Sequence, residues 1–402
     1  MSWIKRTARC CAAVAAFALL VPVTPALALT KAAVQERIGA ALLQSGSSSG
    51  ALVTDLTTKE LLYAARADLA RVPASVEKLY TTATALGRFG PLARLSTELV
   101  ISGTIDDNGV LAGNVILRGG GDPTFSNTDI KTFGHAVKKA GIERISGGVV
   151  GDESLFDKRR GGPASGWRID GYIGGSLGAL VLNRGAGDHR APGLAAARAL
   201  QTELTSLKIP SGVPARTGPT PRAPKRVLLL YSPPIRDLIA LTNIPSDNFL
   251  AEMLIKNLGA RFGGAGTTRA GAGVMRSFLK RFGVTPQISD GSGLSRANRT
   301  SPRQVVKLLT EMHNGSQRAA FEDSLAVAGR SGTLAGRMRG SAAEGACRGK
   351  TGTLSDVSSL SGLCLTKNRH VVVFSILMNE VSPSRARSLQ DSAVRAIANY
   401  GG

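Results

Sequence analysis

The most informative stretch of the chain is residues 73–80, Pro73-Ala74-Ser75-Val76-Glu77-Lys78-Leu79-Tyr80. It predicts the start of a helix that runs to about Leu86. Residues three apart share a face of a helix, so we expect the side chains of Ser75 and Lys78 to touch. A serine hydroxyl becomes a nucleophile when a neighbouring base takes its proton, and a buried lysine in its free-amine form is such a base. The stretch therefore makes Ser75 a candidate nucleophile, and Glu77 is expected to point elsewhere.

Two further short motifs follow along the chain, Ser246-Asp247-Asn248 and Lys350-Thr351-Gly352-Thr353. Each motif has an ordinary structural interpretation when taken alone. A Ser-x-x-Lys pair is most often a surface pair, Ser246 is a suitable helix N-cap, and the lysine motif fits a strand end. Together, in this order and each in a fitting element, they favour one site in which Lys350 is a second cation near Lys78.

The two ends of the chain predict one antiparallel sheet with helices against it. Helix-like and strand-like periodicities alternate there, and the pattern at the front of the chain complements the pattern at the back. The expected elements are helices at 30–44 and 384–400 and strands at 50–55, 60–65, 345–350, 357–366 and 370–378.

The middle of the chain predicts a second, inserted domain. Strand-like stretches at 95–102 and 109–117 flank a turn at 106–109, and residues 208–225 have the proline content of a linker. A strand at 226–231 is expected to follow the linker. The expected organisation is a signal peptide at 1–28, a peptidase domain at 29–90 and 226–402, and an inserted domain at 91–225.

The three motifs together are typical of class A β-lactamases and penicillin-binding proteins. Most of the chain beyond residue 28 resembles the class C low-molecular-mass penicillin-binding proteins, the D-alanyl-D-alanine carboxypeptidase/endopeptidase family. The resemblance implies an α/β (α+β) chain with a penicillin-binding-protein/β-lactamase-like transpeptidase fold. In that fold an antiparallel sheet is flanked by helices and carries an inserted α/β domain. The resembling stretches are 73–80, 119–124, 246–252, 290–296, 332–334 and 348–354.

The chain departs from the family's pattern after residues 176–183. Family members usually carry a further inserted domain at this point. Here only residues 184–192, with the composition of a loop, precede the next predicted helix. We therefore expect the third domain of the family to be absent.

The resemblance implies a role for each motif residue. Ser75 would attack the penultimate D-alanine carbonyl and form an acyl-enzyme, with Lys78 as proton acceptor. Ser246 would relay the proton to the leaving D-alanine, and Asn248 would hold the substrate backbone amide. Lys350 would bind the terminal carboxylate together with Thr351 and Thr353, which flank Gly352. Backbone N–H groups of Ser75 and Thr353 would form the oxyanion hole.

Two candidate substrate-binding residues, Asp122 and Arg296, lie in resembling stretches outside the three motifs. In the family, acidic and basic residues in such stretches help to recognise the charged end of a diaminopimelate-type side chain. The alternative for Asp122 is a turn residue before Pro123. The alternative for Arg296 is a surface salt bridge, and the sequence leaves both alternatives open.

The expected function is a serine D-alanyl-D-alanine carboxypeptidase/endopeptidase that cleaves peptidoglycan stem peptides and is inhibited by covalent binding of β-lactam antibiotics. The alternatives are a serine β-lactamase and a non-catalytic cell-wall binding module. A β-lactamase needs a deacylation base, and we find no second carboxylate motif between the first two motifs. A non-catalytic module would be expected to have lost the serine or a lysine. No metal or other cofactor is expected, because the four histidines are scattered without ligand spacing.

The first residues of the chain predict an exported protein of the periplasm or cell envelope. Lys5, Arg6 and Arg9 precede a short apolar stretch at 10–21, and Ala26-Leu27-Ala28 fits a cleavage site. The apolar stretch is too short to span a membrane, which takes about 20 residues. Two cysteines remain beyond this segment, Cys347 and Cys364. They are expected either to form a disulfide between consecutive strands or to be two buried thiols.

The charge of the chain favours anionic partners. It has 50 Lys and Arg residues against 28 Asp and Glu residues, a net charge of +22. An anionic cell-wall polymer or membrane surface fits the predicted compartment, and the export signal argues against nucleic acid. The alternative is a basic surface that is simply solvated.

Overall fold

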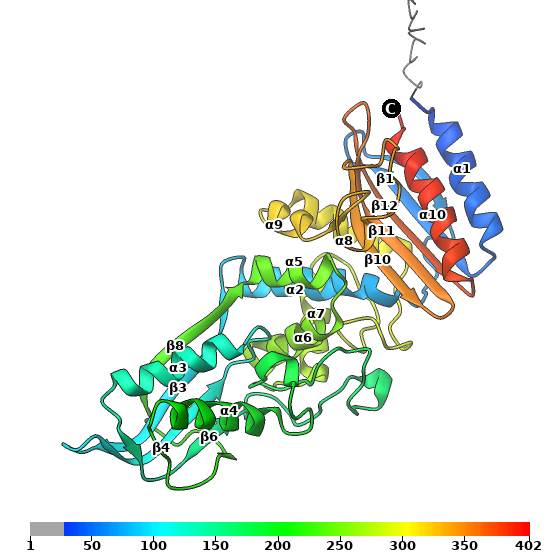
Figure 1. Ribbon diagram of the computed structural model, residues 1–402. Coiled ribbons are helices and arrows are strands. Elements are labelled where there is room, and N and C mark those ends of the chain that lie inside the picture. Colours follow the sequence, from blue (N-terminus) through cyan, green and yellow to red (C-terminus); the bar gives the residue numbers. More distant parts are fainter. Residues whose placement is uncertain (1–27) are drawn as a thin grey trace, which may run out of the picture.

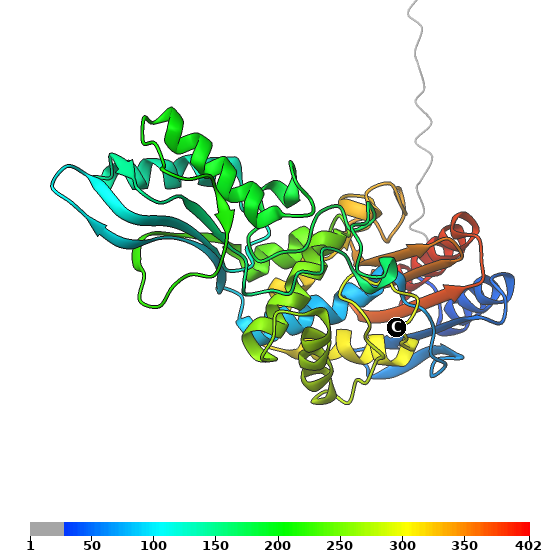
Figure 2. The same ribbon diagram turned by 90° about the horizontal axis from the view of Figure 1, so that it is seen from below.

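The computed structural model describes residues 28–402 (Figure 1). Residues 1–27, almost all of the predicted signal peptide at 1–28, lie outside the described residues. Two six-stranded sheets organise the described chain. Figures 1 and 2 show the first sheet near the C-terminus, the second sheet projecting to one side, and a group of helices between them.

The first sheet is antiparallel and is built from both ends of the chain. Its N-terminal strand β1 pairs with the last strand β12 from Ser49 opposite Met378 to Asp55 opposite Val372. The predicted fold class, with an antiparallel sheet flanked by helices, is confirmed. In spatial order the strands are β2 (Glu60–Ala65), β1 (Ser49–Asp55), β12 (Val371–Asn379), β11 (Val357–Leu365), β10 (Cys347–Leu354) and β9 (Ala326–Val327).

Helices cover both faces of the first sheet. Successive residues of a strand point to opposite faces, and β11 is buried at every position except its last. Leu360 belongs to the apolar core beneath α1 (Lys31–Gln44) and α10 (Pro383–Ala398), whereas Leu363 belongs to the core beneath α8 (Pro302–Asn314). Figure 1 shows α1 and α10 side by side on their face of the sheet.

The helices between the two sheets carry two of the sequence motifs at their N-terminal ends. Lys78 begins α2 and Asn248 begins α6, and α2 is buried from Lys78 to Leu86. These helices share one apolar core with the first sheet. They are α2 (Lys78–Phe89), α5 (Ile235–Asn243), α6 (Asn248–Phe262), α7 (Thr268–Lys280) and the short α9 (Arg318–Asp323).

The second sheet has its own apolar core, covered on one face by α3 (Asn127–Lys139) and α4 (Pro192–Ser206). Its first two strands form a hairpin at the predicted turn, where Asp106 Oδ1 accepts hydrogen bonds from the N–H groups of Asn108 and Val110. The strands are β3 (Arg94–Ile105), β4 (Val110–Gly119), β5 (Arg144–Ile145), β6 (Val149–Asp152), β7 (Arg216–Thr217) and β8 (Lys225–Pro234).

The strand β8 belongs to the second sheet, whereas the sequence grouped residues 226–231 with the peptidase part. It pairs antiparallel with β3, with Lys225 opposite Ile101 and Pro234 opposite Arg94. The pairing satisfies the backbone N–H and C=O groups along the edge of β3 that β4 leaves open. The chain leaves the second sheet after Pro234 and enters α5 directly.

Residues 153–191 form mostly irregular structure that packs against α6. Phe156, Ile173 and Leu177 share an apolar cluster with Phe249 and Met253. The regular segments here are the 3-10 turns η2 (Pro163–Ser165) and η3 (Leu182–Gly185). This packing places the loop at 164–172 close to the N-terminal end of α6.

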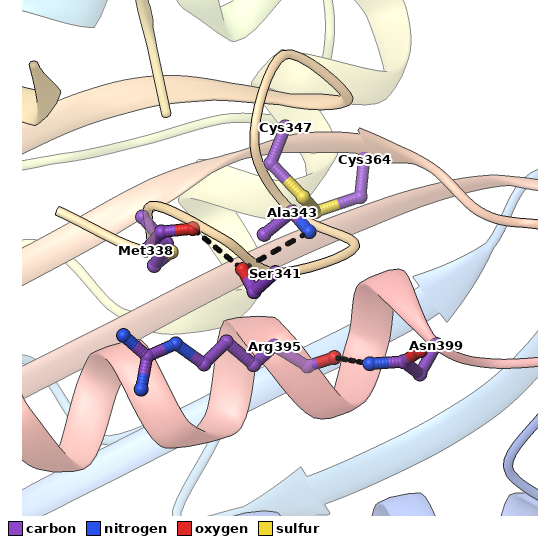
Figure 3. The surroundings of a disulfide bond; sticks show 7 residues. All are labelled: Met338, Ser341, Ala343, Cys347, Cys364, Arg395 and Asn399. Carbon is purple, nitrogen blue, oxygen red and sulfur yellow. Dashed lines mark hydrogen bonds between the residues drawn. A yellow bond between two sulfur atoms is a disulfide. The ribbon is translucent and has the colours of Figure 1, made fainter. Parts of the chain in front are cut away.

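A disulfide joins Cys347 to Cys364 (Figure 3). The two residues are opposite each other in the register of β10 and β11, and both are buried. The bridge therefore fixes the start of β10, three residues before Lys350. No helix within residues 28–402 is long and apolar enough to cross a membrane.

Candidate active site

One cavity of about 1150 Å³ brings the three sequence motifs together. Its walls come from β10, from the N-terminal ends of α2 and α6, from the loop at 164–172 and from the first turns of α10. The lining residues include the motif members Ser75, Ser246, Asn248, Thr351 and Thr353, together with Asp170, Tyr172, Arg296, Thr333, Gly336, Arg337 and Arg387.

Ser75 lies in the 3-10 turn η1 (Ala74–Glu77), directly before α2. Ala74 in this turn has a φ of 49°, which is a strained conformation for a residue with a side chain. Two glycines lie close against the backbone of the turn. A Cβ atom on Gly352 of β10 would lie 2.6 Å from the carbonyl oxygen of Pro73, and one on Gly293 would lie 1.9 Å from that of Ala74. The turn is therefore clamped where only residues without a side chain fit.

The amino group of Lys78 is buried and lies against Ser75. Its Nζ donates hydrogen bonds to Ser75 Oγ at 2.9 Å, to Asn248 Oδ1 at 2.6 Å and to the carbonyl oxygen of Ser292 at 2.7 Å. Burial lowers the pKa of Lys78 to about 8, against the opposing effect of the nearby Asp290 carboxyl. A substantial neutral fraction near that pH gives Lys78 the capacity to accept a proton from Ser75.

Buried carboxyl groups form the floor beneath Lys78. Glu252 Oε1 accepts the N–H groups of Gly291 and Ser292 at 3.0 and 2.9 Å, which orients the Ser292 carbonyl toward Lys78. Burial and the neighbouring Asp290 raise the pKa of Glu252 to about 7. Burial also raises the pKa of Glu77 well above its usual range, and neither of its oxygens has a hydrogen-bond partner among the described residues.

Lys350 lies in β10 and is also buried. Its Nζ donates to the carbonyl oxygen of Thr351 at 2.8 Å. Burial, helped by the positive charge of Lys78, lowers the pKa of Lys350 well below its usual range. From the sequence, the charge of Lys350 was expected to lower the pKa of Lys78. Burial lowers the pKa of Lys78 instead, and the charge of Lys78 helps to lower the pKa of Lys350.

The second motif turns sharply into α6. Ser246 has a φ of 67°, and Asp247 is the N-cap, because its side chain accepts the N–H of Leu250 at 2.8 Å. Asn248 uses its whole side-chain amide: Oδ1 accepts from Lys78, and Nδ2 donates to the carbonyl oxygen of Tyr172 at 2.7 Å. The motif thus joins α6 to both Lys78 and the loop at 164–172.

Three arginines line the cavity, and the chain itself neutralises two of them. Arg296 pairs with Asp356, and Arg337 pairs with Asp391 at 2.7 Å. Arg387 of α10 donates to Thr353 Oγ1 at 3.4 Å and, within residues 28–402, has no carboxylate partner. Its guanidinium is therefore free to bind an anion beside β10.

Comparison with known proteins identifies the family. The model of the D-Ala-D-Ala carboxypeptidase 3 (S13) family matches residues 31–176 and 173–400. The chain belongs to this family. It is 30% identical to the D-alanyl-D-alanine carboxypeptidase of Actinomadura sp. (strain R39), over 89% of this chain and 82% of that protein. Carboxypeptidase DacB of Mycolicibacterium smegmatis is 28% identical, over 87% and 80%.

Solved structures share the fold. Penicillin-binding protein 4 (dacB) from Haemophilus influenzae matches with a TM-score of 0.77 at 20% identity, over 89% of this chain and 97% of that one. Bd3459, a predatory peptidoglycan endopeptidase from Bdellovibrio bacteriovorus, matches with a TM-score of 0.57 at 18% identity, over 83% and 86%. The predicted family and the predicted class of enzyme, a serine-type D-alanyl-D-alanine carboxypeptidase, are confirmed.

The two candidates outside the motifs of this S13 chain lie in different places. Arg296 lines the cavity, where it also donates to Ser355 Oγ at 2.8 Å. Asp122 is buried and does not line it; its Oδ1 accepts the N–H and the hydroxyl of Thr124 at 2.8 and 2.7 Å, as a turn residue does. Among the described residues that line the cavity, Asp170 is the one carboxylate.

The sequence did not single out several lining residues of the S13 cavity. Asp170 and Tyr172 lie in irregular structure, where no periodicity marks a residue. The position of Arg387 could have indicated a functional role. A cation in the first turns of a helix interacts unfavourably with the helix dipole, so its presence there suggests a purpose other than helix stability. Among residues 28–402, no group of three or more His, Cys, Asp or Glu side chains is arranged to hold a metal ion.

Proposed function

We propose that this S13 enzyme cleaves the D-alanyl-D-alanine bond of peptidoglycan stem peptides through an acyl-enzyme on Ser75. The observation that carries the proposal is the buried Lys78 amino group, 2.9 Å from Ser75 Oγ at the edge of the large cavity. The neutral amine takes the hydroxyl proton while Ser75 Oγ bonds to the carbonyl carbon of the penultimate D-alanine. Ser246 passes a proton to the amine of the departing D-alanine. Water then hydrolyses the ester and frees Ser75.

The strand motif and the neighbouring turn would hold the reacting groups. The N–H groups of Ser75 and Thr353 are the proposed donors to the oxyanion, and the close approach that Gly352 permits between β10 and η1 supports this assignment. Asn248 would bind the substrate amide in competition with the Tyr172 carbonyl. Lys350, Thr351 and Thr353 would bind the terminal carboxylate.

Arg387 joins the proposed carboxylate site. It is the unpaired guanidinium beside Thr353, and guanidinium–carboxylate pairs are strong and directional. Asp170 is proposed to bind the ammonium end of a diaminopimelate-type side chain, and Arg296 would bind its carboxylate end in exchange for the pair with Asp356. Asp170 takes the acidic role here because Asp122 lies outside the cavity.

The size of the cavity favours cross-linked stems as additional substrates. Sites for small ligands usually have volumes of about 300–1000 Å³, and this cavity has about 1150 Å³. A free D-alanine leaving group needs little of that space, whereas the second peptide of a cross-link would occupy it. We therefore include endopeptidase cleavage in the proposal.

The proposed setting is the cell envelope, with the segment 1–28 as an export signal and β-lactam antibiotics as covalent inhibitors. The proposed domain division follows the pairing of β8, with a peptidase part at 29–90 and 235–402 and an inserted part at 91–234. The loop composition of residues 184–192 supports the absence of a third domain.

The test is digestion of purified peptidoglycan with product identification, alongside labelling by a fluorescent penicillin. The unmodified enzyme is expected to release D-alanine, to split cross-linked dimers and to become labelled, and Ser75→Ala is expected to do none of these. Continued labelling of Ser75→Ala would overturn the serine assignment. Rapid turnover of a cephalosporin without release of D-alanine would favour a β-lactamase.

A further inference from the structure

A second hollow, of about 690 Å³, lies at the opposite ends of the helices that carry Lys78 and Asn248. Arg88 at the C-terminal end of α2 and Phe262 at the end of α6 form one side of it, and the exposed face of α7 forms the other. Helices rise 1.5 Å per residue, so the hollow is about 20 Å from Ser75. We call it the arginine hollow, after its lining residues Arg88, Arg269 and Arg276.

All three arginines of the hollow are exposed, and none pairs with a carboxylate of the described chain. No Asp or Glu is among the described lining residues. This differs from the cavity at Ser75, where Arg296 and Arg337 are neutralised. Like charges held together without a counter-charge repel one another, and a bound anion relieves that repulsion.

The aromatic ring in the hollow is used to position an arginine. The guanidinium of Arg88 lies over the ring of Phe262, 4.5 Å from its centroid, and Phe89 packs edge-on against the same ring at 4.9 Å. The cation–π contact holds Arg88 in place and also covers the ring face. With Arg88 over one face, the ring of Phe262 serves to position that guanidinium, although the residue is 36% exposed.

The floor of the hollow is a glycine that packing does not require. Gly273 lies between Arg269 and Arg276 on the exposed face of α7. A Cβ atom there would meet only the guanidinium of Arg276, at 3.9 Å. Gly271, by contrast, is needed for packing, since its Cβ would lie 1.9 Å from the carbonyl oxygen of Ile255. A glycine within a helix is destabilising relative to alanine. Since packing does not require Gly273, its effect here is to leave open space between the two arginines.

From these observations we infer that the arginine hollow binds a phosphate-bearing linear polyanion. Guanidinium groups match phosphate oxygens with paired hydrogen bonds. The two arginines of α7 are seven residues apart, about 10 Å along the helix axis, and so reach separate groups of an extended polymer. The net charge of +22, or +19 without Lys5, Arg6 and Arg9 of the proposed export signal, draws such a polymer to the enzyme from a distance. A polymer held here would keep the enzyme on anionic material while the cavity at Ser75 stays free.

The test measures binding of fluorescently labelled inorganic polyphosphate to the full chain at several salt concentrations. The variant Arg88→Gln/Arg269→Gln/Arg276→Gln is expected to bind at least tenfold more weakly. For this variant the slope of log affinity against log salt concentration should become shallower by about two, because contacts with phosphate are lost. The charge-matched control is Arg37→Gln/Arg144→Gln/Arg198→Gln, three exposed arginines without an ion pair among the described residues. It should change binding by less than about twofold.

A second pair of variants tests the hollow without removing an arginine. Gly273→Glu places a carboxylate three residues from Arg276 and four from Arg269, where it pairs with both on the helix surface. It is expected to weaken polyphosphate binding at least tenfold, whereas Gly273→Gln, of the same size, should weaken it by less than threefold. Equal losses in Gly273→Glu and Gly273→Gln would overturn a site based on charge.

Two other outcomes would also overturn the inference. Equal losses in the two arginine triples would mean that only the overall charge matters. Binding of vesicles that contain an anionic phospholipid, dependent on the same three arginines and not displaced by polyphosphate, would reassign the hollow to a membrane surface. Binding is measured without hydrolysis, so these outcomes do not depend on the roles proposed for Ser75 and Lys78.

Discussion

The amino group of Lys78 determines how the reaction of Ser75 depends on pH. Only the neutral amine accepts the serine proton, and its fraction increases as the pH rises through the pKa of about 8. We expect the rate constant for acylation by a fluorescent penicillin to increase about tenfold per unit below about pH 7 and to level off above pH 8. Stopped-flow measurements of acylation over this pH range test the prediction. An acylation rate that falls as the pH rises would contradict the role of Lys78.

Arg387 provides a prediction about selectivity. A hydrogen bond between charged groups contributes about 1.5–3 kcal/mol, so we expect Arg387→Gln to raise the KM for a stem peptide with a free terminal carboxylate about tenfold or more. Cleavage of the same peptide capped as an amide should not change. Arg385→Gln, on the same helix but outside the cavity, is the control. An equal loss on both peptides would point to a general structural effect.

The residues closest to the chemistry were the most predictable from sequence, because their types and spacings are restricted by what they must do. The contact between Ser75 and Lys78 followed from helical spacing alone. Asp170 reaches the cavity only through the folding of distant segments, so no local pattern marks it, whereas the unfavourable place of Arg387 near the start of α10 was a signal in the sequence that was not used. The cluster of buried carboxyls under Lys78 was not predicted, because Glu77, expected only to point away from Ser75, meets Glu252 and Asp290 only in three dimensions.

At the scale of elements, the contact between β10 and η1 controls both stability and reactivity. A Cβ atom on Gly352 would lie 2.9 Å from the backbone nitrogen of Ser75 as well as close to Pro73. We expect Gly352→Ala to lower the free energy of unfolding by about 1–3 kcal/mol, as overpacking does. Acylation of Ser75 should slow at least tenfold, because the serine and its N–H are displaced.

Gly336 is a matched control for that substitution. It lines the same cavity, and a Cβ atom there would meet nothing within 4 Å. Gly336→Ala is expected to leave acylation by a fluorescent penicillin and the urea unfolding midpoint nearly unchanged. Similar losses in the two variants would show that the clamp on η1 is not the cause.

The strands and helices of the first sheet were predicted closely because each has a clear periodicity and turn residues at its ends. The helix α8 was missed although it has clear signals: the side chain of Ser301 caps it, and Pro302 occupies its first turn. The strand β8 was recognised but was grouped with the peptidase part, whereas it pairs with β3 of the second sheet. Periodicity predicts that a segment is a strand, but only the register with β3 determines its partner.

At the scale of the whole molecule, the buried carboxyls make stability depend on pH. Glu252 has a pKa of about 7 in the folded chain, above its usual value of 4.5. Between these values the folded state binds more protons than the unfolded state, so the free energy of unfolding falls as the pH rises. Below about pH 4.5 the contribution of Glu252 to the free energy of unfolding is fully present, and above about pH 7 this contribution is lost.

We expect Glu252→Gln to reduce this fall, because the amide does not ionise and its oxygen still accepts the N–H groups of Gly291 and Ser292. Urea unfolding followed by circular dichroism at pH 5, 6, 7 and 8 measures the slope. Identical slopes for the two proteins would show that Glu252 keeps its charge throughout. Glu311→Gln, which is distant from the cluster, controls for the loss of one carboxylate.

The pairing of β1 with β12 has a consequence for the time at which the enzyme becomes active. A nascent chain emerges with its N-terminus first, so Ser75 is made long before its neighbours. The strands β10, β11 and β12, which clamp the serine turn and complete the sheet, come from the last sixth of the polypeptide. The segment from β3 to β8 can assemble earlier, because its partners are closer in the chain. We therefore expect Ser75 to become reactive only in a chain that includes β12, and a product truncated before β10 to resist acylation by a fluorescent penicillin.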